Sequence, residues 1–109
     1  MTGAEERTTP QHDLNEVKGR VSEEGCQFSK RVRNRQLGRF NCAPEDVEEC
    51  LLALTEDDFY KSQLREQGDN DVWMDIYKPR WDGIDWYVKF FVGVNDRVVV
   101  WSFKWSGTI

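Results

Sequence analysis

The hydrophobic pattern of this chain changes its period part-way along, and this change constrains the possible folds strongly. In the front half, apolar residues recur at helical spacing. After the turn-forming residues 68–70, side chains alternate with a period of two through residues 72–77, 84–92 and 98–105. The chain is therefore predicted to be an α+β domain, with N-terminal helices packed on a C-terminal antiparallel β-sheet of at least three strands.

Capping signals divide the front half of the chain into helices. Gly25 suits a helix C-terminus, Ser29 can cap a new helix, and Pro44 suits a first helical position. The predicted helices cover residues 13–25, 29–38 and 44–54.

A fourth, short helix is predicted to start after Thr55. Thr55 can cap it, and Asp58 stands at the reciprocal position of a capping box, with apolar residues at both hydrophobic-staple positions. This helix is expected to contain residues 60–62 and to end before Gly68.

At 109 residues, the chain has the length of one domain of ordinary size. Its first residues are polar, so we expect residues 1–8 to form a flexible N-terminus and residues 9–109 to form a single domain. No apolar run approaches the roughly 18 residues needed to span a membrane. The start of the chain also lacks the basic and apolar regions of an export signal, so we expect a cytoplasmic protein with no membrane contact.

The formal net charge of -5 is unevenly distributed along the chain. Residues 1–40 contain 8 basic and 6 acidic side chains, and residues 61–109 contain 7 of each kind. Residues 41–60 contain 7 acidic side chains and 0 basic ones. The acidity therefore belongs to residues 41–60, and the total charge does not exclude a nucleic-acid partner. Binding such a partner requires the acidic segment to face away from it.

The cysteines and the histidine do not follow the spacing of a metal site. Cys26, Cys42 and Cys50 form no C-x-x-C pair, and His12 is the only histidine. We predict no cofactor, and we expect the three cysteines to be small buried apolar residues. The chain also lacks a phosphate-binding glycine loop and a Ser-His-Asp order. Any catalysis therefore has to use lysine, tyrosine, arginine or carboxylate groups.

A basic run at residues 30–39 contains five cations. If this run is helical, Arg31, Arg35 and Arg39 form an i, i+4, i+8 stripe that can lie along phosphates. The simpler interpretation is a solvated helix face, paired with the acidic segment that follows, and from the sequence alone we prefer it.

The predicted sheet offers a second candidate surface. Tyr87 and Lys89 share one face of one strand, and Ser102 and Lys104 share one face of the next. Cationic and polar side chains in an aromatic sheet can hold an RNA backbone and stack its bases. The same alternation is also typical of any sheet with one solvated face.

The order and spacing of short sequence words favour a function. The words are Thr9-Pro10, Leu37-Gly38, LALTEDDFYKS at 52–62, VWMDIYKPR at 72–80, YVKF at 87–90 and SFK at 102–104. In this order, and over about residues 9–104, the chain resembles the MqsR family of type II toxin-antitoxin toxins.

The resemblance implies a small messenger-RNA endonuclease with a RelE-like fold, which inhibits translation and growth. Such toxins cut RNA without a metal ion. The expected reaction is attack of a ribose 2′-hydroxyl on the adjacent phosphate, which leaves a 2′,3′-cyclic phosphate and a 5′-hydroxyl end. It requires a group to accept the 2′ proton, cations to stabilise the phosphorane and an acid for the leaving oxygen.

The resemblance also implies site residues, transferred word by word. The lysine of the D-F-Y-K-S word is Lys61, the tyrosine of the Y-x-K word is Tyr87 and the lysine of the S-F-K word is Lys104. We expect Lys61 and Lys104 to act as phosphate and transition-state cations, and Tyr87 as a proton-transfer or positioning group. Lys78 and Arg80, in the Y-K-P-R stretch, are expected RNA contacts.

Two positions depart from the family pattern. The glutamine usual in the family's W-Q-D-V-Y word, counted there with the functional residues, is replaced by Met74, which cannot make the amide's hydrogen bonds. Conversely, Gln63 stands where the family commonly has methionine. Either the loss of the glutamine changes rate or sequence preference, or another group substitutes for it.

The resemblance implies three partners: single-stranded mRNA as the substrate, a cognate antitoxin protein, and DNA only indirectly through that antitoxin. Two alternatives to an active toxin stay open. One is a catalytically weakened toxin-like module that acts mainly by protein binding or by transcriptional co-regulation with an antitoxin. The other is a plain RNA-binding regulator that uses the basic run.

Overall fold

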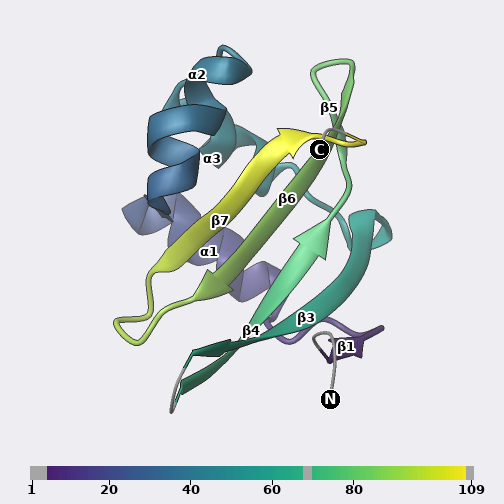
Figure 1. Cartoon of the computed structure of the whole chain (residues 1–109). Coiled ribbons are helices and arrows are strands. Elements are labelled where there is room, and N and C mark those ends of the chain that lie inside the picture. Colours follow the sequence, from purple (N-terminus) through teal and green to yellow (C-terminus); the bar gives the residue numbers. More distant parts are fainter. Residues whose placement is uncertain (1–4, 68–69, 108–109) are drawn as a thin grey trace.

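The computed structural model describes residues 5–67 and 70–107, which form helices on one side of a mixed, mostly antiparallel sheet (Figure 1). The strands are β1 (Glu6–Arg7), β2 (Gln27–Phe28), β3 (Phe59–Gln67), β4 (Asn70–Tyr77), β5 (Arg80–Trp81), β6 (Ile84–Val92) and β7 (Val98–Trp105). The helical elements are α1 (Leu14–Glu24), the π-helix η1 (Val32–Gln36), α2 (Leu37–Arg39), α3 (Pro44–Leu52) and the 3-10 turn η2 (Glu56–Asp58). The predicted α+β class is confirmed.

The strands lie in the order β1-β3-β4-β6-β7-β2, and β5 pairs with β6 outside this path. All neighbours are antiparallel except β2 and β7, which are parallel. The predicted strands 84–92 and 98–105 are found with the same bounds, because their alternation is regular and turns flank them. The prediction of at least three strands is exceeded by the nine-residue strand β3 and by the short strands β1, β2 and β5.

Helix α1 ends at the predicted Gly25, and its N-terminus is capped by Asp13, the first residue of the predicted helix. The side chain of Asp13 accepts a hydrogen bond from the backbone N–H of Glu16 at 3.0 Å. At the other end, Gly25 has a φ of 71°, which glycine adopts without steric strain, and its N–H donates to the carbonyl of Val21. The helix then buries Val17 and Val21 against the sheet.

The predicted helix after Ser29 is a continuous helical segment over residues 30–39, which widens into the π-helix η1. The hydroxyl of Ser29 accepts a hydrogen bond from Val32 N–H at 3.2 Å, as expected for a cap. The side chain of Gln36 then fastens the segment to β7. Its carbonyl oxygen accepts from Phe103 N–H at 2.7 Å, and its amide donates to Ser102 Oγ at 3.3 Å.

Helix α3 starts at Pro44, as predicted, and the carboxylate of Asp46 accepts a hydrogen bond of 2.7 Å from the N–H of Ala43. Its buried residues are Val47, Cys50 and Leu51. These side chains join the core formed with the helix-facing side of the sheet. Across the described residues, no helix is both long and apolar enough to cross a membrane.

The predicted helix after Thr55 is wrong beyond its first turn. The capping contact forms, since the carboxylate of Asp58 accepts a hydrogen bond of 2.8 Å from Thr55 N–H, but only the 3-10 turn η2 follows. From Phe59 onward the chain is strand β3, which pairs with β4 along its length. The cap is a local signal, whereas pairing with β4 satisfies the backbone groups of the whole segment.

The N-terminal residues that the structure describes lie against the sheet edge. We expected residues 1–8 to be flexible, and two of them, Glu6 and Arg7, form strand β1 on β3. The following turn is held by the buried carboxylate of Asp75, which accepts hydrogen bonds from the N–H groups of Gln11 and His12 and from Ser62 Oγ. The extent of the domain, residues 9–109, stays a prediction.

Candidate active site

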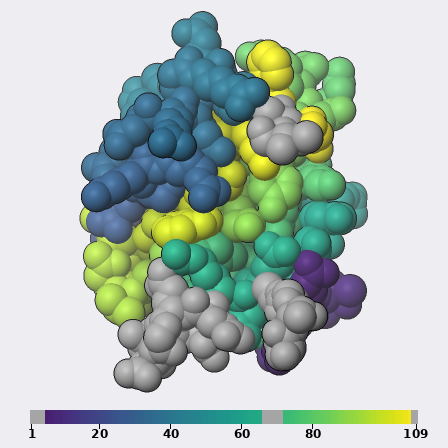
Figure 2. Space-filling view, viewed as in Figure 1, coloured from purple at the N-terminus to yellow at the C-terminus, as the bar shows by residue number. Residues whose placement is uncertain are grey.

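The described residues leave the face of the sheet opposite to the helices uncovered, and we call it the open face. In Figure 2 it lies between the helical segment 30–39 (blue), which stands beside β7 (yellow), and β3 (teal) on the other side. Its polar side chains are Lys61, Gln63 and Arg65 from β3, Tyr87 and Lys89 from β6, and Ser102 and Lys104 from β7. The structure thus brings Lys61, Tyr87 and Lys104 together on one face, from three different strands.

Tyr87 and Lys104 form a direct cross-strand pair between β6 and β7. Nζ of Lys104 lies 5.0 Å from the centroid of the Tyr87 ring. Burial raises the pKa of Tyr87, and the nearby Lys61 cation offsets this rise only in part. The phenol is therefore protonated near neutral pH, which makes it a hydrogen-bond or proton donor.

Lys61 lies directly after a bulge in β3. The register shifts between Phe59 and Lys61, which leaves Tyr60 as the extra residue on that strand. Bulges re-aim side chains and are frequent beside active sites. Here Nζ of Lys61 lies 5.1 Å from the ring centroid of Tyr60, and Nζ of Lys78 lies 3.9 Å from the same centroid. Both lysines therefore lie beside the same ring, which places Lys78 in the cluster around Lys61.

Arg80 does not join this cluster. It belongs to β5, and its guanidinium forms an exposed ion pair of 3.1 Å with Asp85. Of the two expected RNA contacts, only Lys78 therefore lies next to one of the three predicted catalytic side chains.

Glu6 is a site residue that the sequence analysis missed. Its carboxylate accepts a hydrogen bond of 2.6 Å from Nζ of Lys61 and one of 3.0 Å from the amide of Gln63. The hydrogen bond raises the pKa of Lys61, and the hydrogen bonds from Lys61 and Gln63 lower the pKa of Glu6. Lys61 and Glu6 are 55 positions apart, and no local pattern links them.

Lys89 is the second missed residue, although the sequence placed it on the same strand face as Tyr87. It is half-buried, and Nζ donates a hydrogen bond of 3.1 Å to Oε1 of Gln63. Burial lowers its pKa, and four surrounding cations lower it further, namely Arg31, Lys104, Lys61 and Arg65. The surroundings of Lys89 therefore favour its neutral form.

The two departures from the family pattern are neighbours in space. Gln63 and Met74 are direct partners in the β3–β4 ladder, so their Cβ atoms lie roughly 5 Å apart on the same face. Met74 is buried, whereas the amide of Gln63 is hydrogen-bonded to Lys89 and Glu6 on the open face. The chain thus has an amide on this face, one strand away from the family's position.

Helix α3 contains four of the seven carboxylates of the acidic segment, residues 41–60, and packs its apolar residues into the core on the helix-covered side of the sheet. Tyr77 lies in the same core, where burial raises its pKa to about 12, with Asp75, Glu56 and Asp13 adding to the rise. Tyr60, at the end of the segment, instead belongs to the cluster around Lys61. The carboxylates of α3 therefore lie away from the open face, as binding of phosphate to that face requires.

The D-F-Y-K-S and W-x-D-x-Y words also have a structural role. Ser62, from the first word, donates a hydrogen bond to Asp75, from the second, and both side chains are fully buried. His12 N–H donates to the same carboxylate, and the His12 ring contacts the carbonyl of Trp73 at 2.8 Å. These contacts fasten the N-terminal segment beside β4, which brings Glu6 toward Lys61.

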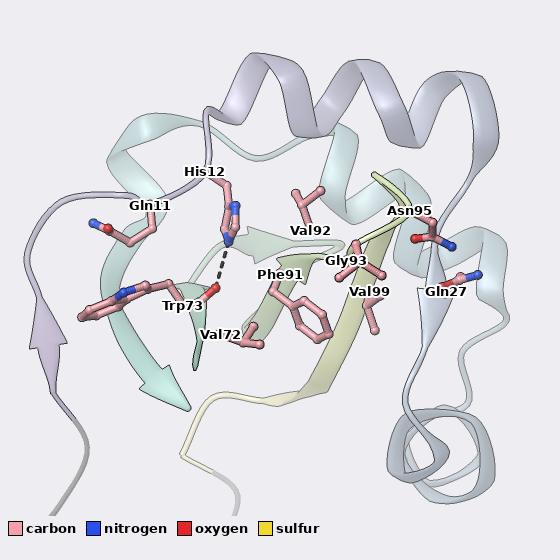
Figure 3. A pocket seen from close by; sticks show the side chains of 11 residues that line it. Gln11, His12, Gln27, Val72, Trp73, Phe91, Val92, Gly93, Asn95 and Val99 are labelled. Carbon is pink, nitrogen blue, oxygen red and sulfur yellow. Dashed lines mark hydrogen bonds between the residues drawn. The ribbon is translucent and has the colours of Figure 1, made fainter. Parts of the chain in front are cut away.

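One cavity lies elsewhere, away from Lys61, Tyr87 and Lys104. It has a volume of about 670 Å³ and is lined by residues such as His12, Trp73, Phe91 and Asn95 (Figure 3). Tyr87 lies in the first half of β6 and Lys104 near the end of β7, whereas the cavity adjoins the opposite ends of both strands. The size of a cavity therefore does not by itself identify the cluster of Lys61, Tyr87 and Lys104 as the candidate site.

The cysteines agree with their predicted role as apolar residues. Cys50 is fully buried, and Cys26 and Cys42 are partly buried against the core. Burial raises the pKa of Cys26 and of Cys50 to about 12, so both thiols stay protonated. In the part of the chain that the structure describes, no three His, Cys, Asp or Glu residues are grouped so that they could hold a metal ion.

Comparison with known proteins agrees with this arrangement. A family model described as "Motility quorum-sensing regulator, toxin of MqsA" matches residues 9–105. The chain is also 30% identical over 104 residues to the "mRNA interferase toxin MqsR" of Escherichia coli (strain K12), with 91% of this chain and 97% of that protein covered. The match to the family model includes the strands that supply Lys61, Tyr87 and Lys104. The chain therefore belongs to the MqsR toxin family.

Proposed function

We propose that this chain is the toxin of a type II toxin-antitoxin system, and that it is a metal-independent endoribonuclease that cleaves mRNA and so inhibits translation and growth. The family membership and the name of the Escherichia coli relative support this proposal. The observation that carries it is the meeting of Lys61, Tyr87 and Lys104 on one face, with the carboxylates of α3 away from that face.

The proposed reaction is an internal transfer at the phosphate. The ribose 2′-oxygen attacks the adjacent phosphorus as its proton passes to a base, and the bond from phosphorus to the 5′-oxygen breaks as that oxygen receives a proton. The products are a 2′,3′-cyclic phosphate and a 5′-hydroxyl end. The protein has to supply a base, an acid and positive charge around the phosphorane.

Lys61 and Lys104 suit the role of cations at the phosphate. Lys61 has a raised pKa and therefore remains charged, and Lys104 stands beside the Tyr87 ring. Their charges would be oriented before the reaction by the strands that hold them, so little reorganisation is needed when charge develops on the phosphorane. Tyr87, whose raised pKa keeps the phenol protonated, suits protonation of the leaving 5′-oxygen.

Lys89 suits the role of the base that accepts the 2′ proton. It lies two residues from Tyr87 on the same strand face, and its position among other cations lowers its pKa. A lysine is a base only in its neutral form, which such surroundings favour. Its hydrogen bond to Gln63 orients the amine within the face.

RNA outside the reacting phosphate is proposed to contact Lys78 and Arg80. Lys78 is exposed beside Tyr60, whose ring is also exposed and can stack on a base. Arg80 can exchange its exposed partner Asp85 for a phosphate, because such surface pairs contribute little.

A cognate antitoxin is proposed as the protein partner, with DNA bound only through it. Since mRNA is the proposed substrate, the cytoplasm is the proposed place of action.

End-mapping of RNA tests the proposed function. Brief expression of the chain should stop growth and leave cellular RNA with new 5′-hydroxyl ends at defined positions. Lys61→Ala and Tyr87→Phe should abolish both effects, while Lys30→Ala, an exposed lysine outside the three-residue cluster, should not. Intact RNA after incubation with purified wild-type protein, over a range of salt concentrations, would overturn the proposal.

A second candidate is favoured by two observations in the site. Met74 replaces the family's glutamine, and the ammonium group of Lys61 is already hydrogen-bonded to the carboxylate of Glu6. In this alternative the chain is a weakened toxin that acts mainly by protein binding or by co-regulation with an antitoxin. Expression without growth arrest, and equal behaviour of the wild type and the Lys61→Ala variant, would favour it.

A further inference from the structure

A second group of cations borders the open face at β7. Arg31, Arg35 and Arg39 line a cavity of about 250 Å³ whose opposite wall includes Lys104, with Gln36 and Phe40 at its base. The predicted i, i+4, i+8 stripe therefore exists, and its three arginines are exposed, as expected for the solvated helix face preferred from the sequence. Among the ion pairs of the described residues, none joins these arginines to the acidic segment, so the expected pairing is not found there.

The fold holds these arginines in place through backbone and side-chain contacts. Ser29 caps the segment and also donates from its hydroxyl to the carbonyl of Trp101 in β7 at 3.1 Å. Gln36 is bonded to both Ser102 and Phe103, on the same strand. The helical segment is therefore fastened along β7, and successive arginines of the stripe advance by roughly 6 Å along its axis.

The positive charges of this cavity and of the open face reinforce one another. Arg31 is close enough to Lys89 to lower its pKa, and Lys104 belongs to both groups. Several cations without paired carboxylates repel one another, and a bound anion relieves this repulsion. The arrangement therefore favours a ligand with more than one negative charge.

Phe40, which lines the cavity, and Trp105, whose ring packs on that of Phe40, point to a nucleic acid. The guanidinium of Arg39 lies 5.3 Å from the Phe40 ring centroid, and the Phe40 ring lies 5.0 Å from that of Trp105. Trp105 is 44% exposed, although it is a large apolar residue. Cations interleaved with an exposed aromatic ring are typical of surfaces that bind single strands, where the ring stacks on a base.

We propose that the cavity formed by Arg31, Arg35, Arg39 and Lys104 binds backbone phosphates of single-stranded RNA next to the cleaved position, and that the adjacent Trp105 stacks on a base. This inference rests on the proposed function for the identity of the substrate. It extends the substrate-binding surface from the sheet to the helical segment 30–39. Tight binding of the substrate should therefore require several nucleotides on one side of the cut.

A pair of charge-matched variants tests the proposal. Arg31→Gln/Arg35→Gln removes two cations from the cavity, and Lys30→Gln/Arg33→Gln removes two exposed cations of the same segment that do not line it. Binding of a single-stranded RNA is measured by fluorescence anisotropy at several salt concentrations, with a 2′-deoxy sugar at the cleaved position so that the strand cannot be cut. The slope of log Kd against log salt should fall by about 1.4 in the cavity variant only, because each phosphate contact on a single strand contributes about 0.7.

Substrate length and the tryptophan supply the second measurement. With a cleavable RNA trimmed to a dinucleotide around the cut, the KM of both charge variants should match that of the wild type, and with a longer RNA only the cavity variant should show a raised KM. Trp105→Ala should weaken binding of RNA but not of polyphosphate, which has the same charges and no bases. Equal weakening of both ligands would mean an anion site without base stacking, and would overturn the assignment to RNA.

The outcomes separate this inference from the proposed function. If wild-type protein binds RNA with the expected salt slopes but cleaves none, the proposed function fails and the phosphate site stands. If cleavage is normal and the two charge variants behave alike, the phosphate site fails. A loss of affinity for a purified antitoxin in the cavity variant, with RNA binding unchanged, would also overturn it in favour of a protein interface.

Discussion

The ammonium group of Lys61 donates a hydrogen bond of 2.6 Å to the carboxylate of Glu6, at the edge of the open face. A carboxylate thus occupies the position in which Lys61 would hold a phosphate. Both side chains are partly exposed, so the pair exchanges readily with other ligands. The contact links strand β1 directly to the proposed chemistry.

We expect Glu6→Gln to lower the KM for RNA by roughly two- to fivefold, with kcat unchanged, because the variant removes a negative charge that competes with phosphate for Lys61. Steady-state cleavage of a fluorescent RNA measures both constants. Glu5→Gln, an exposed neighbour, is the charge-matched control. A large fall in kcat for Glu6→Gln would instead show that the carboxylate takes part in proton transfer.

The pairing of Gln63 with Met74 predicts that the two residues can be exchanged. Gln63→Met should lower kcat/KM by about tenfold or more, since the hydrogen bonds to Lys89 and Glu6 are lost. The double variant Gln63→Met/Met74→Gln should recover most of this loss, because the amide reaches the same face from the adjacent strand. A double-mutant cycle on kcat/KM measures the coupling. Additive losses would show that the two positions are independent.

The lowered pKa of Lys89 predicts a particular pH dependence. If neutral Lys89 is the base, kcat/KM rises with pH up to the pKa of Lys89, which lies below the ordinary value for lysine. Lys89→Arg keeps the charge but cannot lose its proton, so this rise should disappear and the activity should fall by about 100-fold or more. Lys78→Arg serves as the control. An active Lys89→Arg variant with an unchanged pH profile would limit Lys89 to phosphate binding.

Asp75→Asn should destabilise the fold by about 2 kcal/mol. The buried carboxylate accepts hydrogen bonds from two backbone N–H groups and from Ser62. In the variant, the side-chain NH₂ group would face some of these donors and could not accept their hydrogen bonds. Equilibrium unfolding in urea measures the change. Asp82→Asn, at an exposed turn residue with a φ of 53° that asparagine also tolerates, should have little effect. Equal stability of the two variants would contradict this role for Asp75.

Much of the fold follows from local sequence patterns. The alternation in residues 84–92 and 98–105 predicted strands β6 and β7 with their bounds, and the helical spacing from Asp13, together with Gly25, predicted the two ends of α1. Period and capping depend on residues within a few positions of one another, so a single sequence suffices for them. The same holds for the sequence words that identify the family.

Strand β3 shows where local signals fail. Thr55 and Asp58 form the predicted capping contact, yet the chain turns only once before Phe59 enters the sheet. The hydrogen bonds that decide the outcome come from β4, whose alternating pattern was evident but whose partner was not. As a result, Lys61 was assigned to a helix, although its place in the set of site residues did not depend on that assignment.

The sequence by itself determined the class of fold, the ends of its most regular elements and three residues of the proposed site, Lys61, Tyr87 and Lys104. Only the tertiary structure decided that Glu6 contacts Lys61, that Gln63 lies opposite Met74 and that the arginines of the basic run face Lys104. The physical reason is the same in each case. Periodicity tells which side of an element a residue occupies, whereas contacts across a sheet depend on the register between segments that are distant along the chain.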